Sequence, residues 1–390
     1  DTFEPGSTAK TLTIAAALDS GKITGNESYD CQGKLAVSGH NIKCNRVSGH
    51  GILSVSGALE QSCNVALMKI AAAMGTDTFM KYLTNFNIGL KTNVDLAGEA
   101  RTASLVYEPQ NMVASDLAIS SFGQGYNVTM MQIASAFCSV INGGYYMEPH
   151  VVREIRNAEG VTVQKNDTRV LKQVISSEVS EKMRGYLAAV CTKGTGKTAV
   201  PSGYLIGGKT GTAETVPRKQ GNYVVSFIGF APVDDPQVVV YAVVDRPNVA
   251  DQPHSTFAQE LVRDIFTEIL PYMNIFRTEE LSEEQIEELT RLGIIPGGNI
   301  EDAQMGEDTG AQDVETQPSE GNGQPGEVQE EEERQEEEQQ TGGDGSSPEE
   351  EGDAPYETDT ETGYLIEPDS GLLINPDTME YVDPTISLFD

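Results

Sequence analysis

A hydroxyl and an amine stand one helical turn apart near the start of the sequence, in Ser7-Thr-Ala-Lys10. If this segment is helical, both side chains lie on one face, with Ser7 at the positive end of the helix dipole. Lys10 can then take the proton of Ser7, provided that burial and a second cation lower the pKa of Lys10. A Ser-x-x-Lys spacing arises easily by chance, so a nucleophilic serine needs support from other motifs.

Two further motifs carry complementary polar groups. Ser62-Cys-Asn64 places a hydroxyl and an amide just before an expected helix, and by itself it indicates a helix cap. Lys209-Thr-Gly-Thr212 places an ammonium and two hydroxyls in an expected strand. Together the three motifs could supply a nucleophile, a proton relay and a site for an anionic group.

The order and spacing of these motifs, with the sequence around them, are similar to the transpeptidase domain of class B penicillin-binding proteins, the division and sporulation type. The similarity runs from Asp1 to about Asn274. The segments that carry it are Glu4-Pro-Gly-Ser-Thr-Ala-Lys10, Gln61-Ser-Cys-Asn64, Ser121-Phe-Gly-Gln-Gly125, Asn142-Gly-Gly144, Gly207-Gly-Lys-Thr-Gly-Thr-Ala-Glu214 and Ser226-Phe-Ile-Gly-Phe-Ala-Pro232.

The resemblance implies a serine acyl-enzyme mechanism. Ser7 would attack the carbonyl between two D-alanines of a peptidoglycan stem peptide, with Lys10 as its base. Ser62 would relay the proton to the leaving amine, and Asn64 would hold the amide of the peptide. An acceptor amine from a second strand would then convert the ester into a cross-link. Penicillin and other β-lactam antibiotics would acylate the same serine.

The resemblance also assigns roles to the third motif. Lys209 would attract the terminal carboxylate of the substrate, helped by the hydroxyls of Thr210 and Thr212. Gly211 would keep the strand free of bulk where the substrate lies beside it. The backbone N–H groups of Ser7 and Thr212 would form the oxyanion hole, where each donor contributes about 3 to 4 kcal/mol in other acyl-transfer enzymes.

Other functions remain open. A serine β-lactamase or a D,D-carboxypeptidase would pass the acyl group to water, although no carboxylate in a recognisable deacylating loop is evident and Ser121 to Gly125 favours a transpeptidase. A non-catalytic β-lactam sensor or cell-wall scaffold would not need the full set of polar groups. The resemblance further implies an N-terminal membrane anchor, an upstream strand of the sheet and the extracytoplasmic face of a bacterial cytoplasmic membrane. We expect the anchor and this strand to lie outside the chain, and partners in a membrane-bound cell-wall synthesis machinery.

A second group of side chains could bind a metal. Cys31 and Cys44 are separated by twelve residues, with His50 six residues further on and Asp30 adjacent. Disulfide, zinc and reduced thiols all remain open, with a structural zinc held by these four residues slightly favoured. His40 is the alternative fourth ligand. Catalysis itself is expected to need no cofactor, and the other cysteines, Cys63, Cys138 and Cys191, are expected to pack inside.

A phosphate-binding loop is rejected although its pattern is present. Gly203-Tyr-Leu-Ile-Gly-Gly-Lys-Thr210 fits G-x4-G-K-[ST]. A phosphate loop must lead into a helix whose N-terminus faces the anion, whereas a strand end and a loop follow Thr210. Leu205 and Ile206 would also fill the cradle with apolar side chains.

Charge is distributed very unevenly along the 390 residues, which carry a net −34. Residues 301–390 hold 29 of the 60 acidic residues and one of the 26 basic residues, Arg334, a net of −28 that leaves −6 for residues 1–300. A nucleic-acid binder is excluded because it needs clustered Lys and Arg. Such an acidic segment with few apolar residues is expected to be disordered.

Periodicity and cap signals predict an α+β fold, an antiparallel sheet covered by helices with an inserted helical subdomain, as in the penicillin-binding protein transpeptidases and serine β-lactamases. Residues 28–51 are expected to be a loop. The domains are expected at 1–275 (transpeptidase), 276–300 (short helical extension) and 301–390 (acidic tail), the last with an octapeptide repeat at 363–378. The predicted helices are 8–18, 65–74, 108–120, 129–142, 178–192, 255–270 and 280–292, and the predicted strands are 151–155, 161–164, 205–214, 223–231 and 238–245.

Overall fold

The computed structural model describes residues 1–291 together with three pairs of residues at 357–358, 365–366 and 373–374. These fall into two separate units, one within Asp1–Gln312 and the other within Asp313–Asp390. The acidic tail that is predicted to be disordered lies outside the described residues, apart from these three pairs, which form short strands. Within it, no helix has both the length and the apolar character needed to cross a membrane.

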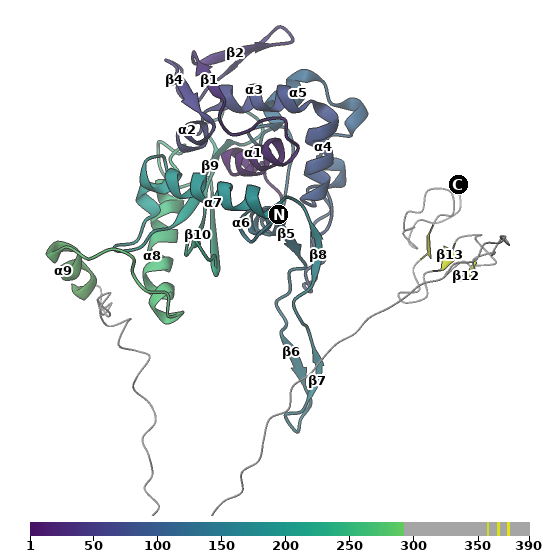
Figure 1. The fold of residues 1–390 in the computed structure, drawn as a ribbon, viewed down its shortest axis with the longest axis vertical. Helices are drawn as coiled ribbons and strands as arrows, with labels where there is room; N and C mark the ends of the chain where they lie inside the picture. The colour runs from purple at the N-terminus through teal and green to yellow at the C-terminus, as the bar shows by residue number, and fades with distance from the viewer. Residues whose placement is uncertain (292–356, 359–364, 367–372, 375–390) are drawn as a thin grey trace, which may run out of the picture. The chain divides into compact units, whose positions relative to one another are not determined.

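A three-stranded antiparallel sheet is the centre of the first unit (Figure 1). Its strands are β9 (Gly207–Glu214), β10 (Tyr223–Ala231) and β11 (Val238–Asp245), in the order β11-β10-β9. The bounds of β10 and β11 agree with the sequence prediction because their apolar runs end at turn-forming residues.

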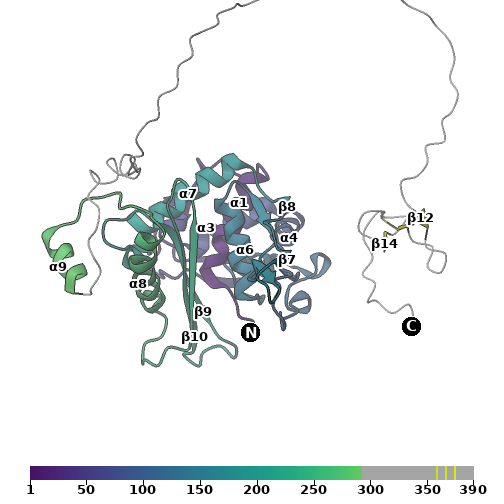
Figure 2. The same ribbon diagram turned by 90° about the horizontal axis from the view of Figure 1, so that it is seen from below.

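The two faces of β10 bury neighbouring side chains in different cores. Phe227 packs with α8 (Thr256–Tyr272), whereas Ile228 and Phe230 join the larger core on the opposite face. This alternation follows from the two-residue period of a strand. Figure 2 shows α8 on one side of the sheet, with α1 (Lys10–Asp19) and α6 (Met130–Ile141) on the other.

Helix α1 (Lys10–Asp19) is buried on all sides, as expected for a helix that is apolar all round. A 3₁₀ turn, Gly6–Ala9, leads into it. The other helices are α2 (Val55–Glu60), α3 (Asn64–Met74), α4 (Thr76–Asn85), α5 (Ala114–Ser120), α6 (Met130–Ile141), α7 (Ser177–Thr192) and α9 (Glu283–Arg291), with short 3₁₀ turns at Ala103–Leu105, Pro109–Asn111 and Lys197–Ala199.

The predicted α+β fold is confirmed, with corrections in detail. The prediction at 108–120 is right only from Ala114, because Pro109–Asn111 forms a separate 3₁₀ turn. Helices α2 and α4 were not predicted. Ser176 caps α7, its Oγ accepting from the N–H of Val179.

The predicted loop at 28–51 is wrong, because this segment forms two small antiparallel pairs. Strand β1 (Ser28–Cys31) pairs with β4 (Gly51–Ser54), and β2 (Lys34–Val37) pairs with β3 (His40–Lys43). The strands are only four residues long, too short for periodicity to reveal.

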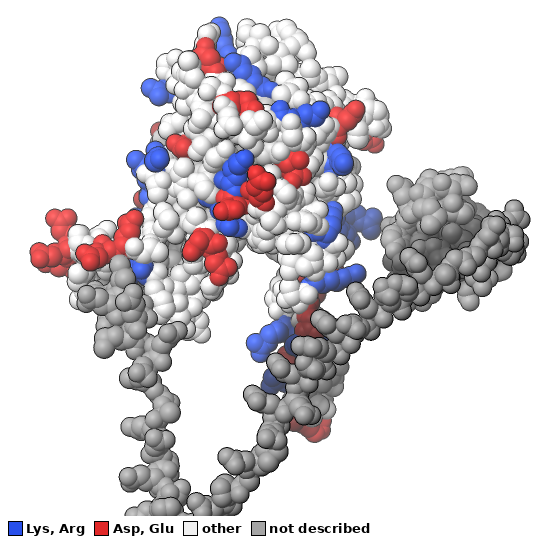
Figure 3. Space-filling model, viewed as in Figure 1, with Lys and Arg blue, Asp and Glu red and all other residues white. Residues whose placement is uncertain are grey.

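A longer ribbon projects from the same unit (Figure 1). Strand β5 (Tyr145–Met147) pairs with β8 (Val170–Gln173), and the predicted hairpin is present as β6 (Glu154–Arg156) and β7 (Thr162–Lys165). Figure 3 shows basic and acidic side chains interspersed over the visible face, with acidic ones gathered over α9.

The described residues of the second unit are three two-residue strands, β12 (Glu357–Thr358), β13 (Leu365–Ile366) and β14 (Leu373–Ile374). They pair antiparallel in that order. Leu365 pairs with Ile374 and Ile366 with Leu373, so equivalent residues of the octapeptide repeat lie on neighbouring strands.

Candidate active site

Ser7 lies in the 3₁₀ turn, half-buried, where the turn meets the sheet. Gly6 has φ +56°, and its N–H donates to Gly123 O at 2.9 Å. A Cβ on Gly6 would stand 2.7 Å from Thr212 O, so only glycine allows this close approach to β9. The Ser7 turn is therefore held directly against the strand that carries the third motif.

Lys10 begins α1 and is fully buried. Its Nζ donates to Ser62 O at 2.6 Å, Ser62 Oγ at 3.1 Å and Asn64 Oδ1 at 2.7 Å. Burial lowers the pKa of Lys10 to about 8, against a smaller opposing effect of Cys44 and Cys63. The lysine of the first motif is thus tied to the second motif and is poised to lose its proton near neutral pH.

Ser62 lies at the joint between α2 and α3 with φ +52°, an uncommon conformation for a residue other than glycine. The N–H of Ser62 donates to Leu59 O at 3.1 Å, and that of Cys63 donates to Ala58 O at 2.8 Å. Cys63 then caps α3, its Sγ accepting from the N–H of Ala66 at 3.4 Å. These bonds hold Ser62 in its strained conformation and aim its hydroxyl at the two lysines.

Lys209 reaches the same hydroxyl from β9. Its Nζ donates to Ser62 Oγ at 3.0 Å and to the carbonyl and hydroxyl oxygens of Thr210, each at 3.1 Å. Burial, and then the charge of Lys10, place the pKa of Lys209 well below its ordinary value. Thr195, which the sequence did not single out, extends the network, with its Oγ1 3.1 Å from Thr210 Oγ1.

Gly211 is closely packed against side chains of the protein itself. A Cβ at this position would meet Ser226 Oγ at 2.2 Å and Thr8 Cγ2 at 3.1 Å, both of them protein atoms. Ser226 is the cross-strand partner of Gly211 and lies on the same face of the sheet. The glycine is therefore needed for packing between β9, β10 and the Ser7 turn.

The second cluster contains the side chains of Cys31, Cys44, His50 and Cys63, whose ligand atoms all lie within 4.8 Å of one another. His50 Nδ1 is 3.4 Å from Cys31 Sγ and 3.6 Å from Cys44 Sγ, and the sulfurs of Cys44 and Cys63 are 3.8 Å apart. The cluster directly adjoins the second motif, because Cys63 lies between Ser62 and Asn64. All five cysteines of the chain are free thiols in the structure.

Two of the predicted ligands are wrong. Asp30 is exposed, and its carboxylate accepts from Gln32 Nε2. Adjacent residues of a strand point to opposite faces, so Asp30 turns away where Cys31 turns inward. His40 is also exposed, and Cys63 takes the fourth place instead. The sequence did contain a signal for Cys63, because it is a third thiol and lies within the second motif.

The thiols of Cys44 and Cys63 affect each other. The hydrogen bond between the two sulfurs, aided by backbone groups, lowers the pKa of Cys44, while the same hydrogen bond and burial raise the pKa of Cys63. Thiolate sulfur and imidazole nitrogen are the ligands that zinc prefers.

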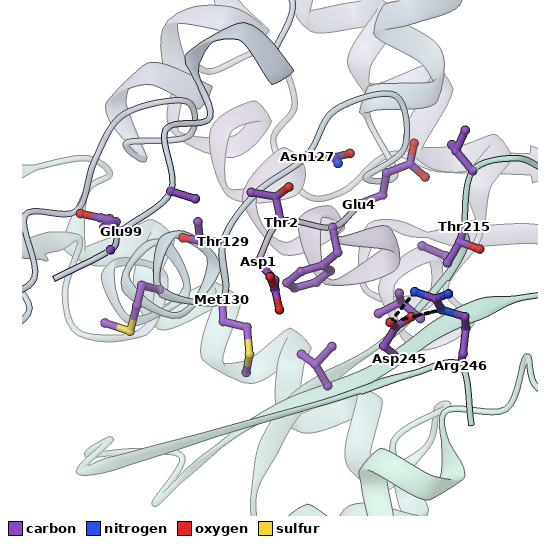
Figure 4. A pocket seen from close by; sticks show the side chains of 18 of the residues that line it. Asp1, Thr2, Glu4, Glu99, Asn127, Thr129, Met130, Thr215, Asp245 and Arg246 are labelled. Carbon is purple, nitrogen blue, oxygen red and sulfur yellow. Dashed lines mark hydrogen bonds and ion pairs between the residues drawn. The ribbon is translucent and has the colours of Figure 1, made fainter. Parts of the chain in front are cut away.

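A cavity of ≈ 710 Å³ lies beside this site rather than in it. Glu4, Thr215, Asp245 and Arg246 are among the residues that line it (Figure 4). No residue of the three motifs lines this cavity. Strand β9 contributes Ala213 and Glu214, which follow the third motif. The look-alike phosphate loop is no site either, because Gly207–Glu214 is a strand and leads into no helix.

The structure thus brings Lys10, Ser62, Asn64, Lys209 and Thr210 into one hydrogen-bonded network. The turn that holds Ser7 adjoins this network, because it leads directly into Lys10 and its Gly6 lies against the backbone of Thr212. Two buried amines of lowered pKa around a single serine hydroxyl can move a proton between a nucleophile and a leaving group. When it is protonated, Lys209 beside the hydroxyls of Thr210 and Thr195 suits a carboxylate.

Comparisons with known proteins agree with this arrangement. Residues 1–267 match the family described as penicillin binding protein transpeptidase domain. Stage V sporulation protein D of Bacillus subtilis is 37% identical over 280 residues, covering 70% of this chain and 43% of that protein. Penicillin-binding protein PbpB of Mycolicibacterium smegmatis is 29% identical over 288 residues, which cover 70% of this chain and 44% of that protein. The chain therefore spans less than half the length of these two relatives.

Solved structures show the same fold. The transpeptidase domain of penicillin-binding protein 3 from Burkholderia pseudomallei superposes with a TM-score of 0.63 at 27% identity, covering 72% of this chain and 82% of that chain. Penicillin-binding protein 3 from Mycobacterium tuberculosis, complexed with aztreonam, gives a TM-score of 0.64 at 25% identity. The match covers 72% of this chain and 65% of that chain.

Proposed function

Because the chain belongs to the penicillin-binding protein transpeptidase family, class B, we propose that it is a peptidoglycan D,D-transpeptidase working through a serine acyl-enzyme. The observation that carries this proposal is the convergence of Lys10 and Lys209 on Ser62 Oγ, beside the turn that holds Ser7. A proton can pass from Ser7 through this network to a departing amine. Two further relatives support the choice of substrate by their names, the peptidoglycan D,D-transpeptidase FtsI homolog of Mesostigma viride and the probable peptidoglycan D,D-transpeptidase PenA of Neisseria flavescens, which are 27% and 26% identical to this chain.

In the first step, neutral Lys10 takes the proton of Ser7 as Ser7 Oγ attacks the carbonyl between two terminal D-alanines. The resulting oxyanion accepts hydrogen bonds from the backbone N–H groups of Ser7 and Thr212. When the C–N bond breaks, Ser62 passes a proton to the leaving amine, and D-alanine departs. An ester on Ser7 remains.

In the second step, an acceptor amine attacks the ester and loses its proton to the same network. The bond between the acyl carbon and Ser7 Oγ breaks, and Ser7 Oγ regains its hydrogen. An amide cross-link between two stem peptides forms. Lys209, Thr210 and Thr212 bind the terminal carboxylate of the donor, and Asn64 holds its amide. A β-lactam would acylate Ser7 in the same way, and this chemistry requires no cofactor.

Acylation and turnover can be tested on one protein sample. Benzylpenicillin should add once to Ser7, and a donor peptide ending in D-Ala-D-Ala with an added amine should yield D-alanine and the cross-linked product. Loss of the penicillin adduct within seconds would favour a serine β-lactamase, and release of D-alanine to water alone would favour a D,D-carboxypeptidase. A stable adduct without peptide turnover would favour a β-lactam sensor or scaffold.

The second cluster supports a structural zinc site. Tetrahedral zinc with Zn–S of about 2.3 Å and Zn–N of about 2.0 to 2.1 Å places sulfurs about 3.8 Å apart and sulfur and nitrogen about 3.6 Å apart. The Cys44–Cys63 distance of 3.8 Å and the two His50 distances of 3.4 and 3.6 Å agree with this geometry. Cys31, Cys44, Cys63 and His50 would hold the ion, which would thereby fix Cys63 and its neighbours Ser62 and Asn64.

The zinc proposal has a structural consequence for the two small β pairs. Cys31 ends β1 and Cys44 follows β3, whereas Cys63 begins α3. One ion would therefore cross-link three elements, in addition to the hydrogen bond that Lys69 Nζ of α3 donates to Asp30 O of β1, and its binding would contribute to folding. The site would be structural, since four protein ligands leave no open position for substrate.

For location, we propose the extracytoplasmic face of a bacterial cytoplasmic membrane, because the substrate is the cell wall. An N-terminal anchor outside this sequence and partners in membrane-bound cell-wall synthesis belong to the same proposal. The similarity to stage V sporulation protein D supports a role in sporulation ahead of one in division.

A further inference from the structure

The carboxylate of Glu4, three residues before Ser7, joins separate parts of the active site. Its Oε1 accepts from the backbone N–H of Gly125 at 2.9 Å. Both of its oxygens also lie 2.7 Å from Arg218 Nη2. The Glu4 side chain is 12% exposed and that of Arg218 is 34% exposed, so this ion pair is more protected from water than a typical surface pair.

Arg218 belongs to the loop of residues 215–222 between β9 and β10. Its Nη1 donates to the carbonyl of Glu214, the last residue of β9, and the Glu214 carboxylate accepts from the N–H of Lys219. The planar guanidinium offers donors on two nitrogens in a fixed geometry. Arg218 therefore connects the end of β9 directly to the segment that precedes Ser7.

This connection spans the two segments expected to form the oxyanion hole. On one side, Phe3 exchanges two backbone hydrogen bonds with Val128, and Gly6 donates to Gly123, so the segment before Ser7 is fixed to residues 123–128. On the other side, the Gly6 backbone contacts Thr212, and the Glu4–Arg218 pair adds a charged link. The distance between the Ser7 and Thr212 N–H groups therefore depends on the contacts with residues 123–128 and on the contacts with Thr212 and Arg218.

We propose that Glu4 and Arg218 are positioning residues that hold the Ser7 turn and the Thr212 strand at the separation the oxyanion requires. This inference rests on the proposed acyl-transfer function. Neither side chain touches the reacting atoms in this arrangement. Because oxyanion donors must lie about 3 Å from the developing charge, a small relative shift of the two segments slows the reaction without preventing substrate binding.

The neighbouring ion pair of Asp245 and Arg246 provides a matched control. It lines the same cavity as Glu4 (Figure 4), but its side chains are 54% and 61% exposed and join adjacent residues at the end of β11. Asp245→Asn removes a carboxylate charge as Glu4→Gln does. It leaves the Ser7 segment untouched.

The test measures single-turnover acylation by a fluorescent penicillin over a range of concentrations, which separates the dissociation constant from the first-order acylation rate constant. Glu4→Gln and Arg218→Ala should each lower the rate constant by about 10- to 100-fold and leave the dissociation constant near the wild-type value. The double variant should be no slower than the slower single variant, because both remove one link. Asp245→Asn should acylate at the wild-type rate.

Added guanidinium ion at millimolar concentration should restore part of the rate of Arg218→Ala and leave the wild-type rate unchanged, since it can occupy the vacated site beside Glu4. A wild-type rate constant in folded Arg218→Ala would overturn the proposal. If Asp245→Asn lowers the acylation rate constant as much as Glu4→Gln does, the proposal is also overturned. The same holds if the rate constant of Arg218→Ala falls together with its Tm and guanidinium does not restore it, because the ion pair would then only stabilise the protein in general. If the wild-type protein itself is not acylated at Ser7, the proposed function fails and this inference fails with it.

Discussion

Lys10 and Lys209 donate to the same oxygen, with their Nζ atoms 3.1 and 3.0 Å from Ser62 Oγ. Both lysines are fully buried, and the second motif supplies the other acceptors of Lys10. Burial, and then the nearby charge of Lys10, lower the pKa of Lys209, because both disfavour its charged form. One of the two amines can therefore be neutral at a pH where an ordinary lysine is charged.

Ser7→Ala should abolish the single mass adduct formed with benzylpenicillin, because Ser7 is the proposed nucleophile. Intact-mass spectrometry measures this directly. Ser48→Ala, at an exposed position away from the motifs, should form the adduct like the wild type. An adduct that persists in Ser7→Ala would move the nucleophile to another residue.

Acylation should become faster as the pH rises through about 8, the value to which burial lowers the pKa of Lys10. The active form is the neutral amine, so below this pH the rate constant should fall about tenfold per pH unit. Stopped-flow acylation between pH 6 and 10 measures the profile, with circular dichroism to confirm that the protein stays folded. A profile that is flat, or that rises only near pH 10.5, would contradict the assignment of Lys10 as the base.

Lys209→Ala should slow acylation by about 10- to 100-fold, since a charge-assisted hydrogen bond contributes about 1.5 to 3 kcal/mol. The loss should be smaller for a β-lactam ester that lacks the carboxylate proposed to bind Lys209. Lys193→Ala, an exposed lysine at the end of α7, is the control and should have no effect. Unchanged kinetics in a folded Lys209→Ala protein would remove this lysine from the site.

Protein purified without added metal should contain about one zinc per chain, bound by three thiolates and one imidazole. Elemental analysis gives the metal content, and thiol titration under denaturing conditions should count all five cysteines. Cys63→Ser should lose the zinc and slow acylation, because Cys63 connects the cluster to Ser62. Cys138→Ser should keep the zinc and acylate at the wild-type rate.

Two results would exclude zinc at this cluster. Five thiols without metal would leave ordinary reduced cysteines. Three thiols without metal would indicate a disulfide.

Gly211→Ala should destabilise the protein by about 1 to 3 kcal/mol, as expected for overpacking. The added Cβ would lie 2.2 Å from Ser226 Oγ, and Ser226→Gly should recover part of the loss. Equilibrium urea denaturation measures both. Gly185→Ala in α7, where nothing lies within 4 Å, should instead stabilise the protein slightly. Equal stabilities of Gly211→Ala and wild type would show that β9 and β10 can move apart there.

Local patterns were sufficient for much of the fold. The apolar runs of β10 and β11 and the amphipathic face of α6 depend on neighbouring residues, so the sequence predicted them within a residue or two. Short strands such as β1 and β2 depend on a partner elsewhere in the chain, and the expected loop at 28–51 was wrong for that reason. Domain boundaries at 275 and 300 stay predictions.

The three motifs, their order and their spacing are properties of the sequence alone, and they were enough to predict the family and its chemistry. Only the tertiary structure decided which groups meet. Ser62 and Lys209 are 147 residues apart, and Glu4 and Arg218 are 214 apart, so their contacts depend on how α1, α3 and β9 pack. The same packing replaced Asp30 by Cys63 in the cysteine cluster, because strand alternation turned one residue of β1 outward while the cap of α3 turned another sulfur in.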